Sequence, residues 1–339
     1  MTTDRERVFV YVSNIESREV LVFELNMTNG ELQLVEHVLG GKFGALAVVA
    51  DKRFLYATLR DAPYAIATLA IDPNTGKLEH IGETPLPAAL AYVSIDGSGR
   101  WLLGASYHQD MIVVCALSPD GVPQEPHQVV TQVPKAHCVL VDPRNEFVLA
   151  TALGADALLR WPFDPERGTL NEQQKLTTRM APGAGPRHME FSASGDQLYV
   201  LNELDASLCV LHYDSISGPH EPHQKLSTLP ARFRGKPWAA DVHVTPNGRF
   251  LYACERSSSA IAAFTIDSVT GALAPYGTLV TEKQPRSFAI DPTGRYLLIA
   301  GEKSNRLSVY SIDASSGALT MLAPYGVGAN PVWLEIVAI

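Results

Sequence analysis

An arginine and a histidine are adjacent in the segment GAGPRHMEF, residues 183–191, at the start of an apolar run typical of a β-strand. Other titratable side chains stand in comparable surroundings, among them His137, Glu203 and Arg286. A base surrounded by arginines suits reactions in which water or an internal group attacks or leaves a carbonyl while negative charge grows on oxygen. Lactone opening requires no more than these groups, provided that the fold brings them together.

Sequence signatures of several other chemistries are missing. The chain contains no G-x-S-x-G elbow, no H-E-x-x-H pair, no P-loop and no Rossmann fingerprint, and GVGAN near the C-terminus opens no helix. Nucleophilic serine hydrolysis, zinc proteolysis and dinucleotide binding therefore lack support. A fold can assemble carboxylate and amide ligands from distant segments, but no feature here calls for a metal. We expect neither a metal nor an organic cofactor.

The elements that must position these residues form a repeat. Six segments share a short apolar strand, a turn resembling D-P-x-G-R and a second strand: VVADKRFLYAT, SIDGSGRWLLGAS, LVDPRNEFVLAT, EFSASGDQLYVLN, HVTPNGRFLYAC and AIDPTGRYLLIA. Anchored on Lys52, Gly97, Pro143, Ala193, Pro246 and Pro292, the repeats are 45, 46, 50, 53 and 46 residues apart. Each continues into a third strand and, across a turn such as NTGKL, a fourth. Four antiparallel strands per period of about 45 residues predict a β-propeller.

The two ends of the chain complete the count of repeats. The N-terminal segment RVFVYVSNIESREVLVFELNMTNGELQLVEHV supplies a second, third and fourth strand, and PVWLEIVAI at the C-terminus supplies a first strand. Joined together, they make a seventh blade and leave no sheet edge open at the ring closure. We therefore predict an all-β fold: residues 1–339 form a single seven-bladed β-propeller domain.

The repeat also predicts which residues share one face of the disc. The first strand of each blade lines the central channel, so its start meets the end of the second strand at a common mouth. The position six residues N-terminal to each turn anchor is held in turn by Leu46, Ala91, His137, Arg187, Ala240 and Arg286. At the ends of the second strands stand Arg60, Tyr107, Ala152, Glu203, Arg256 and Glu302. We expect a concave polar site at the mouth, with Arg60 and Glu302 on a solvated rim.

Further contacts to a ligand are expected beside this mouth. The longest repeat contains LPARFRGKPWAADVHV, and the extra residues make a basic, aromatic loop in which Arg232, Arg234 and Lys236 are candidates to hold a phosphate as part of a lid. Asp241 follows the loop and is placed to orient an arginine or a histidine. His188 and His243 have the opposite strand parity from the mouth residues such as Arg187. Each of the two histidines therefore either contacts the substrate or hydrogen-bonds within the blade wall.

Composition restricts the partners and the compartment. The formal net charge of -9 argues against a nucleic-acid or anionic-membrane surface. No apolar run approaches the roughly 18 residues of a membrane span, and MTTDRERVFVYVS does not resemble a signal peptide. Cys115, Cys138, Cys209 and Cys254 lie in apolar strand-like runs without metal-ligand spacing, which predicts free core thiols in a reducing cytoplasm.

Long blocks of the sequence resemble bacterial 6-phosphogluconolactonases of the seven-bladed propeller type. These blocks are GAGPRHMEF, VLNELDAS, WAADVHVTPNGRFLYACERSSS and TEKQPRSFAIDPTGRYLLIAGEKSNRLSVYSI, and the likeness covers essentially the whole chain. The resemblance implies hydrolysis of a phosphorylated sugar lactone, 6-phospho-D-glucono-1,5-lactone, in the pentose phosphate pathway without a cofactor. The wider family includes fungal carboxymuconate-lactonizing enzymes, whose histidine, two arginines and glutamate match His137, Arg187, Arg286 and Glu203 here.

The resemblance and the strand register lead to one assignment and two alternatives. His137 or Glu203 activates water, Arg187 and Arg286 bind the oxyanion or the phosphate, and Arg256 is a further candidate for the phosphate. A cycloisomerase acting on a carboxylated muconolactone is the second possibility, because arginines serve carboxylates and phosphates alike. A non-catalytic propeller that binds a protein partner is the third.

Overall fold

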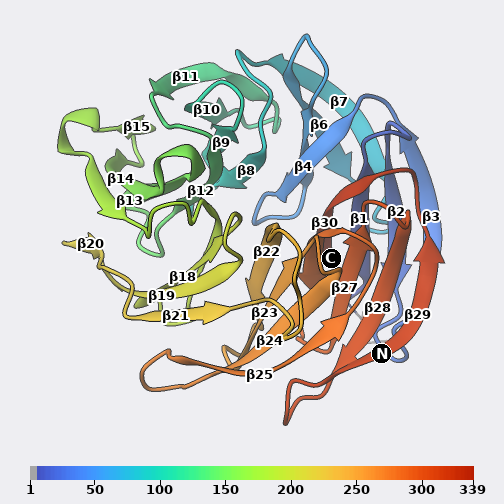
Figure 1. Cartoon of the computed structure of the whole chain (residues 1–339). Coiled ribbons are helices and arrows are strands. Elements are labelled where there is room, and N and C mark those ends of the chain that lie inside the picture. The colour runs from blue at the N-terminus through green and yellow to red at the C-terminus, as the bar shows by residue number, and fades with distance from the viewer. Residues whose placement is uncertain (1–5) are drawn as a thin grey trace.

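Seven β-sheets surround a central channel in the computed structural model, which describes residues 6–339 (Figure 1). Each sheet pairs its strands in an antiparallel, up-and-down order from the channel to the rim. The predicted seven-bladed β-propeller is therefore confirmed.

The innermost strand of every blade lines the channel. Going around the ring, each innermost strand contacts the next. These strands are β4 (Phe43–Val48), β8 (Tyr92–Ile95), β12 (Ala136–Val141), β17 (Pro186–Phe191), β22 (Ala239–Val244), β26 (Pro285–Ile290) and β30 (Pro331–Ala338).

The remaining strands build each blade outward. The second strands are β5 (Phe54–Leu59), β9 (Trp101–Ser106), β13 (Phe147–Ala152), β18 (Gln197–Asn202), β23 (Phe250–Glu255), β27 (Tyr296–Gly301) and β1 (Val8–Asn14). The third strands are β6 (Ala65–Ile71), β10 (Met111–Leu117), β14 (Ala157–Asp164), β19 (Ser207–Asp214), β24 (Ala260–Ile266), β28 (Arg306–Ile312) and β2 (Glu19–Leu25). The outer strands are β7 (Leu78–Pro85), β11 (Pro123–Thr131), β15 (Thr169–Leu170), β16 (Leu176–Arg179), β20 (Gly218–Pro219), β21 (Gln224–Ser227), β25 (Leu273–Val280), β29 (Leu319–Gly326) and β3 (Leu32–Leu39).

The two ends of the chain share one blade, as the repeat count predicts. Strand β30 pairs with β1 in the sheet β3-β2-β1-β30. Beyond these strands, Arg7 and Ile339 exchange two backbone hydrogen bonds of 3.0 and 2.8 Å. Ring closure thus pairs strands from opposite ends of the sequence and removes the edge that an open array would expose.

The turn between the first and second strands is stabilised by a buried aspartate in several blades. The Oδ1 atom of Asp291 accepts hydrogen bonds from the backbone N–H groups of Arg295 and Tyr296, at 2.7 and 2.6 Å. Asp96 and Asp142 make the equivalent pair of bonds in their own blades. A side chain that satisfies two turn donors specifies the hairpin locally, which is why the motif recurs at a fixed period.

The core is distributed between blades. Seven apolar clusters fill the spaces between adjacent sheets, and each draws its buried side chains from two neighbouring blades. The four cysteines are buried and free, as predicted. Burial of this kind stabilises the ring as a whole, because each blade covers the apolar faces of two others.

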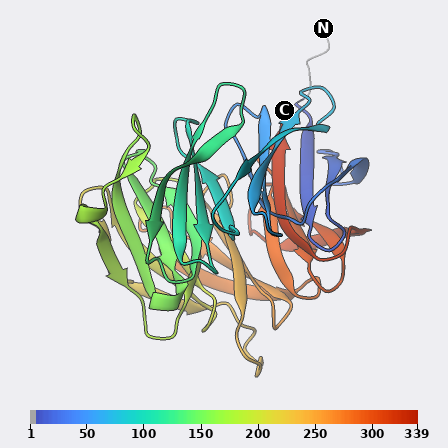
Figure 2. The same ribbon diagram turned by 90° about the horizontal axis from the view of Figure 1, so that it is seen from above.

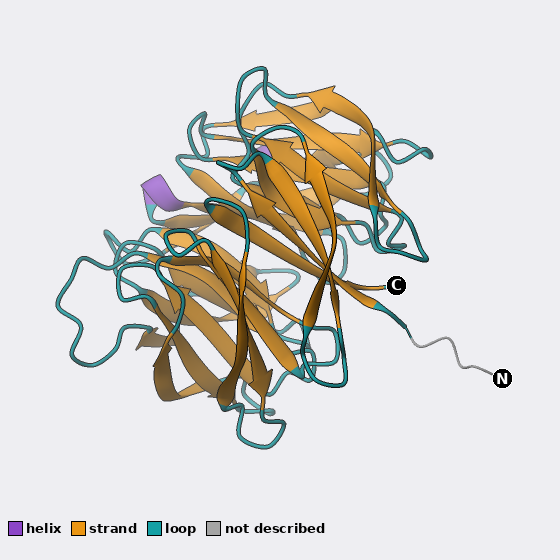
Figure 3. Cartoon of the chain, turned by 90° about the vertical axis from the view of Figure 1, so that its right-hand side faces the viewer, coloured by secondary structure: helices purple, strands orange, loops and turns teal. Residues whose placement is uncertain are grey.

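Helical structure in residues 6–339 consists of two 3₁₀ turns, η1 (Leu153–Ala155) and η2 (Glu172–Gln174) (Figure 3). Neither is long and apolar enough to cross a membrane.

Candidate functional site

The predicted mouth lies on one face of the disc. There the innermost strands begin and the second strands end, whereas β1 begins and β30 ends at the opposite face (Figure 2). At this end of the innermost strand, the pairing with the second strand slips by one residue in six blades. Such β-bulges redirect side chains and are frequent beside functional sites. The mouth is therefore lined by bulged residues.

The bulge in β17 determines where Arg187 and His188 point. Pro186 pairs with Asn202 and His188 with Leu201, so Arg187 is the extra residue. Strict alternation would send the two side chains to opposite faces, but Nη1 of Arg187 lies 3.0 Å from Nε2 of His188. The bulge interrupts the alternation on which the parity argument rests, and His188 hydrogen-bonds to Asp241 in the channel wall, which is one of the two expected alternatives.

The first repeat, when anchored on Lys52, is two residues out of register with the others. Lys52 takes the left-handed conformation, with φ 61°, that Gly294 takes in the last turn, with φ 70°. Lys52 therefore corresponds to Gly294, and the mouth residue of this blade is Gly44 instead of Leu46. A Cβ atom at Gly44 would lie 2.9 Å from Cδ of Arg60, so glycine at this position leaves room for that arginine.

Two other expectations about the second-strand ends need correction. Strand β13 ends at Ala152, so the position equivalent to Glu203 is Leu153. Glu302 is 8% exposed and does not lie on a solvated rim. Arg60 is partly buried, and burial together with the nearby Arg286 lowers its pKa to about 10. Arg60 and Glu302 therefore belong to the group of charged side chains at the mouth. The sequence argument placed them on the solvated rim because it considered each charge alone.

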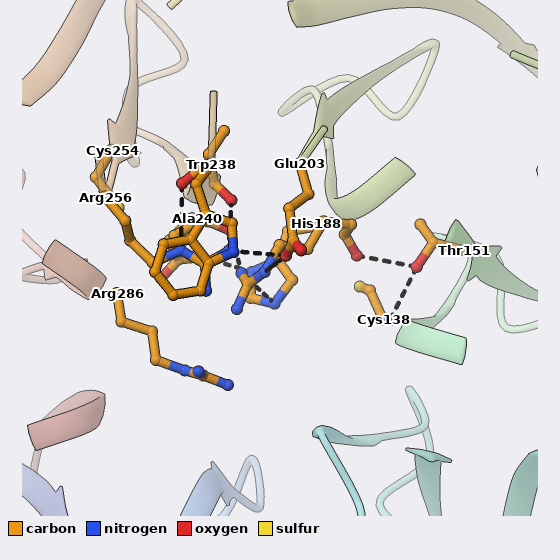
Figure 4. A network of polar contacts seen from close by, with 12 residues as sticks. Cys138, Thr151, His188, Glu203, Trp238, Ala240, Cys254, Arg256 and Arg286 are labelled. Atoms are coloured by element: carbon orange, nitrogen blue, oxygen red, sulfur yellow. Dashed lines mark hydrogen bonds and ion pairs between the residues drawn. The ribbon is translucent and has the colours of Figure 1, made fainter. Parts of the chain in front are cut away.

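Glu203 holds two arginines at the centre of the mouth. Its Oε2 atom lies 3.1 Å from Nε of Arg187 and 2.8 Å from Nη2 of Arg256. Arg256 also donates to the backbone oxygens of Ala239 and Trp238, and its guanidinium lies 3.8 Å from the centre of the Trp238 ring. Nε and Nη2 of Arg256 are thus engaged by the protein, and dashed lines mark contacts of this network in Figure 4.

Arg187 is nearly inaccessible yet keeps one nitrogen uncommitted. Its Nη1 atom contacts Nε2 of His188 and donates to the backbone oxygen of Ala240. Its own backbone oxygen accepts from Oγ1 of Thr151 at 2.9 Å. The residue is 1% exposed. Nε faces Glu203 without forming a hydrogen bond, and Nη1 is used by His188 and Ala240, so Nη2 is the terminal nitrogen with no hydrogen bond among residues 6–339.

Arg286 is the more accessible arginine. Its side chain is 20% exposed, and its Nη1 atom reaches Oε1 of Glu302 only at 3.4 Å. The opposite carboxylate oxygen of Glu302 is held at 2.6 Å by Nε2 of Gln284. In Figure 4 the guanidinium of Arg286 lies apart from the network around Glu203 and Arg256. It is therefore available to an incoming anion.

His137 is a buried imidazole held in its neutral form. Burial, followed by the charge of Arg187, lowers its pKa well below the usual value. Its ring packs edge-on against His188 and Tyr107, with centroids 5.1 and 5.9 Å apart. Within residues 6–339, the buried Nδ1 atom has no hydrogen-bond partner. A neutral imidazole with an unused nitrogen can accept a proton.

Glu203 is less suited to that role. Burial alone would raise its pKa, but Arg187 and Arg256 outweigh that effect and hold the pKa below the usual value. The pKa of both candidates is lowered, so the difference between them is that a proton on Glu203 would break two ion pairs, whereas His137 has no ion pair to lose.

The mouth carries uncompensated positive charge. Four guanidinium groups, those of Arg60, Arg187, Arg256 and Arg286, face the two carboxylates of Glu203 and Glu302. Burial is the main cause that lowers the pKa of Arg60, Arg187 and Arg256, and in each case another arginine of this group lowers it further. Such mutual repulsion is costly unless an anion binds, so the cluster is built to receive one.

The basic loop is not drawn into this cluster. Arg232, Arg234 and Lys236 lie at the surface, and Arg234 donates to backbone oxygens of the loop itself. Only the end of the loop touches the site, through Trp238, which is 37% exposed and stacks on Arg256. The loop contributes its aromatic residue to the site.

His188 and Asp241 lie behind the arginines. Nδ1 of His188 is 2.7 Å from Oδ1 of Asp241, and the two residues are each 4% exposed. His188 therefore has both ring nitrogens engaged, by Asp241 and by Arg187. His243 lies beyond them, 3.4 Å from Oδ2 of Asp241 and 2.9 Å from Oε2 of Glu190.

Several hollows lie outside the mouth. One, a surface depression of about 530 Å³, is lined by residues including Glu6, Arg7, Glu24 and Glu31, so acidic side chains outnumber basic ones there. A cavity of about 210 Å³ inside the channel is lined by residues including Asp241, His243 and Glu335. We place the site at the mouth because the positive charge and the neutral imidazole occur together there. In residues 6–339, no three histidine, cysteine or acidic side chains are grouped to hold a metal ion.

Comparison with known proteins identifies the family to which the chain belongs. The family profile described as "Lactonase, 7-bladed beta-propeller" matches residues 8–336. The 6-phosphogluconolactonase of Serratia proteamaculans is 36% identical over 97% of this chain and 98% of its own length. That of Pectobacterium carotovorum is 37% identical over 97% and 98%. The solved structure of the periplasmic gluconolactonase of Pseudomonas aeruginosa superposes with a TM-score of 0.91 at 26% identity, covering 99% and 100% of the two chains.

Proposed function

The chain belongs to the seven-bladed β-propeller lactonase family, and from that premise we propose that it hydrolyses 6-phospho-D-glucono-1,5-lactone to 6-phosphogluconate. The enzyme would be a carboxylic ester hydrolase of the pentose phosphate pathway. Its relatives named 6-phosphogluconolactonase align over nearly the full length of both chains.

One observation carries the substrate assignment. The mouth has an excess of two guanidinium groups over carboxylates beside a neutral imidazole. A sugar lactone bearing a phosphate dianion supplies the matching negative charge and a carbonyl for the imidazole-activated water. Guanidinium groups bind phosphate in a bidentate manner, which orients the ring of the substrate.

His137 is the proposed general base. It removes a proton from a water molecule as the water oxygen attacks C1 of the lactone, and the carbonyl electrons move onto the exocyclic oxygen. Nη2 of Arg187 stabilises that oxyanion. When the tetrahedral intermediate collapses, the C1–O5 bond breaks and the imidazolium of His137 returns the proton to O5. Because the imidazole is neutral before the reaction and regenerated after it, no external acid is needed.

The phosphate is assigned to Arg286 and Arg60. Arg286 is the most exposed paired arginine of the cluster, and its contact with Glu302 is long enough to be exchanged for a phosphate oxygen. Arg256 is a weaker candidate because Glu203, two backbone oxygens and Trp238 already engage it. Arg232, Arg234 and Lys236 would take part only if the loop closed over the bound substrate.

The decisive experiment is an assay on freshly generated 6-phosphogluconolactone. Its decay should exceed the spontaneous rate in proportion to enzyme concentration, with and without a chelator, since we propose no metal or organic cofactor. Turnover of a carboxylated muconolactone instead would identify a cycloisomerase. Absence of turnover with both substrates would leave a binding propeller and overturn the proposal.

We also propose a cytoplasmic location, where the phosphorylated substrate would be produced. The four free, buried cysteines are compatible with a reducing compartment. Fractionation of the native host, followed by lactonase assay of each fraction, tests this location.

A further inference from the structure

Asp241 bridges three neighbouring innermost strands behind the mouth. It stands on β22, its Oδ1 atom contacts Nδ1 of His188 on β17, and its Oδ2 atom accepts from the backbone N–H of Phe288 on β26 at 3.3 Å. The same Oδ2 atom lies 3.4 Å from Nε2 of His243. A carboxylate with both oxygens engaged across three blades has a fixed orientation.

The contacts of His188 determine which ring nitrogen carries its proton. A guanidinium can only donate, so Nε2 of His188, 3.0 Å from Nη1 of Arg187, must offer its lone pair. The proton of the neutral ring then resides on Nδ1 and is donated to Asp241. Burial and the neighbouring charge of Arg187 lower the pKa of His188 to about 4, which keeps the ring neutral around pH 7.

We propose that Asp241 is a positioning residue for lactone hydrolysis, acting through the tautomer of His188 to hold the guanidinium of Arg187 with Nη2 facing the mouth. The inference rests on the proposed function of the same site. Nη1 of Arg187 is held by Nε2 of His188 and by the backbone oxygen of Ala240, and its Nε faces Glu203. These three contacts define the plane of the guanidinium. A donor fixed before the reaction stabilises an oxyanion without reorganisation.

Asp241→Asn is the first test. The amide of the variant can present a donor to Nδ1, which moves the imidazole proton to Nε2 and sets it against the donors of Arg187. We expect kcat to fall about 100-fold, with KM within a factor of about three, because misplacement of one donor acts on the transition state. Asp291→Asn is the matched control: it changes another buried carboxylate, one that directly follows an innermost strand at the end away from the mouth, and it should leave kcat unchanged.

A spectroscopic measurement tests the tautomer directly. Nitrogen chemical shifts of the His188 ring should report a neutral ring protonated at Nδ1 in the wild-type protein and at Nε2 in Asp241→Asn. A wild-type ring protonated at Nε2 would overturn the inference whatever the kinetics. Because this readout needs no turnover, it remains informative if the lactone proves not to be the substrate.

A second pair of variants keeps the test valid should Asp241→Asn not fold. In His188→Gln, the amide oxygen can accept from Arg187 in place of Nε2, so kcat should stay within about fivefold of wild type. His188→Leu offers no acceptor and should lose about 100-fold. Equal losses in the two variants would contradict the proposed role.

The kinetic coupling completes the test. In an Arg187→Lys background, Asp241→Asn should reduce kcat by less than about threefold, since the group that it positions is gone. A full loss of about 100-fold in that background would show that Asp241 acts elsewhere. Wild-type enzyme without lactonase activity would refute the proposed function, whereas an active enzyme insensitive to Asp241→Asn would refute only the positioning role.

Discussion

The two ends of the innermost strands differ in what the repeat preserves. At the turn end, Asp96, Asp142 and Asp291 make the same pair of backbone hydrogen bonds in three blades. At the mouth end, the equivalent bulged positions of successive blades hold different residues, among them Gly44, His137, Arg187, Ala240 and Arg286. The turn end repeats the same stabilising hydrogen bonds from blade to blade, whereas the mouth end brings unlike side chains together in a single site.

This difference has a physical basis. A turn is satisfied by its own blade, so the same residue works in each repeat. The mouth is shared by all blades, and identical residues there would surround the axis with like charges or with apolar groups. Chemistry needs a donor, an acceptor and a base at different angles around one point, which only divergent repeats can supply.

The largest effect is expected from Arg187→Ala at the mouth. The change removes the proposed oxyanion donor and leaves Arg256 as the only arginine paired with Glu203 among residues 6–339. We expect kcat to fall about 10²–10³-fold, the usual result of removing one such donor. Steady-state kinetics on the lactone measure it, and a loss confined to KM would instead assign Arg187 to the phosphate.

His137→Gln should produce the next largest loss. The amide retains much of the size of the ring but cannot accept the proton of water, so kcat should fall about 100-fold. A pH-rate profile checks the assignment. If Glu203 were the base, His137→Gln would leave most of the activity, and Glu203→Gln would remove it.

Arg286→Ala should act on binding. Losing a guanidinium that contacts the phosphate should raise KM about 10- to 30-fold, with kcat little changed. The unphosphorylated glucono-1,5-lactone provides the control, because the variant and the wild type should hydrolyse it at similar kcat/KM. An equal loss on both lactones would place Arg286 at the carbonyl.

Asp291→Ala tests the turn end of the comparison. The change leaves the partly buried N–H of Arg295 and the buried N–H of Tyr296 without their acceptor, which should cost about 1–3 kcal/mol in the free energy of unfolding. Urea denaturation measures this loss, and kcat at 25 °C should be unaltered. A variant with reduced kcat and normal stability would contradict the claim that the turn end serves folding and the mouth end serves catalysis.

The smallest expected effect is on the pH dependence of stability. The pKa of His188 is lowered to about 4 in the folded protein, against about 6.5 in the unfolded chain, so between these values the unfolded state binds a proton that the native state does not. The contribution of His188 to stability is therefore present above about pH 6.5 and is lost as the pH falls. At about pH 5.5 the loss should be about 1 kcal/mol and absent from His188→Gln. Urea denaturation at several pH values measures this loss. The same change in the free energy of unfolding with pH in the wild type and in His188→Gln would contradict the prediction.

The pKa of His243 is shifted in the direction opposite to that of His188. Despite its partial burial, Asp241 and Glu190 hold the pKa of His243 well above its usual value. NMR should therefore find His243 protonated and His188 neutral at pH 7, although both contact Asp241.

Sequence alone determined the architecture of this protein. The period, the turn motif and the split blade predict seven blades because the turns and strands depend on nearby residues. The same register brings His137, Arg187, Arg286, Glu203 and Arg256 to one face. Free buried cysteines also followed from their apolar surroundings.

How these residues are paired and oriented became apparent from the three-dimensional structure. Gly44 replaced Leu46 because Lys52 adopts a left-handed conformation, and His188 turned toward Arg187 because β17 carries a bulge. Glu203 pairs with Arg187 on its own sheet and with Arg256 on the next. Side-chain direction depends on the hydrogen-bond register between strands, and charge pairing depends on distances across blades, neither of which a local pattern of residues contains.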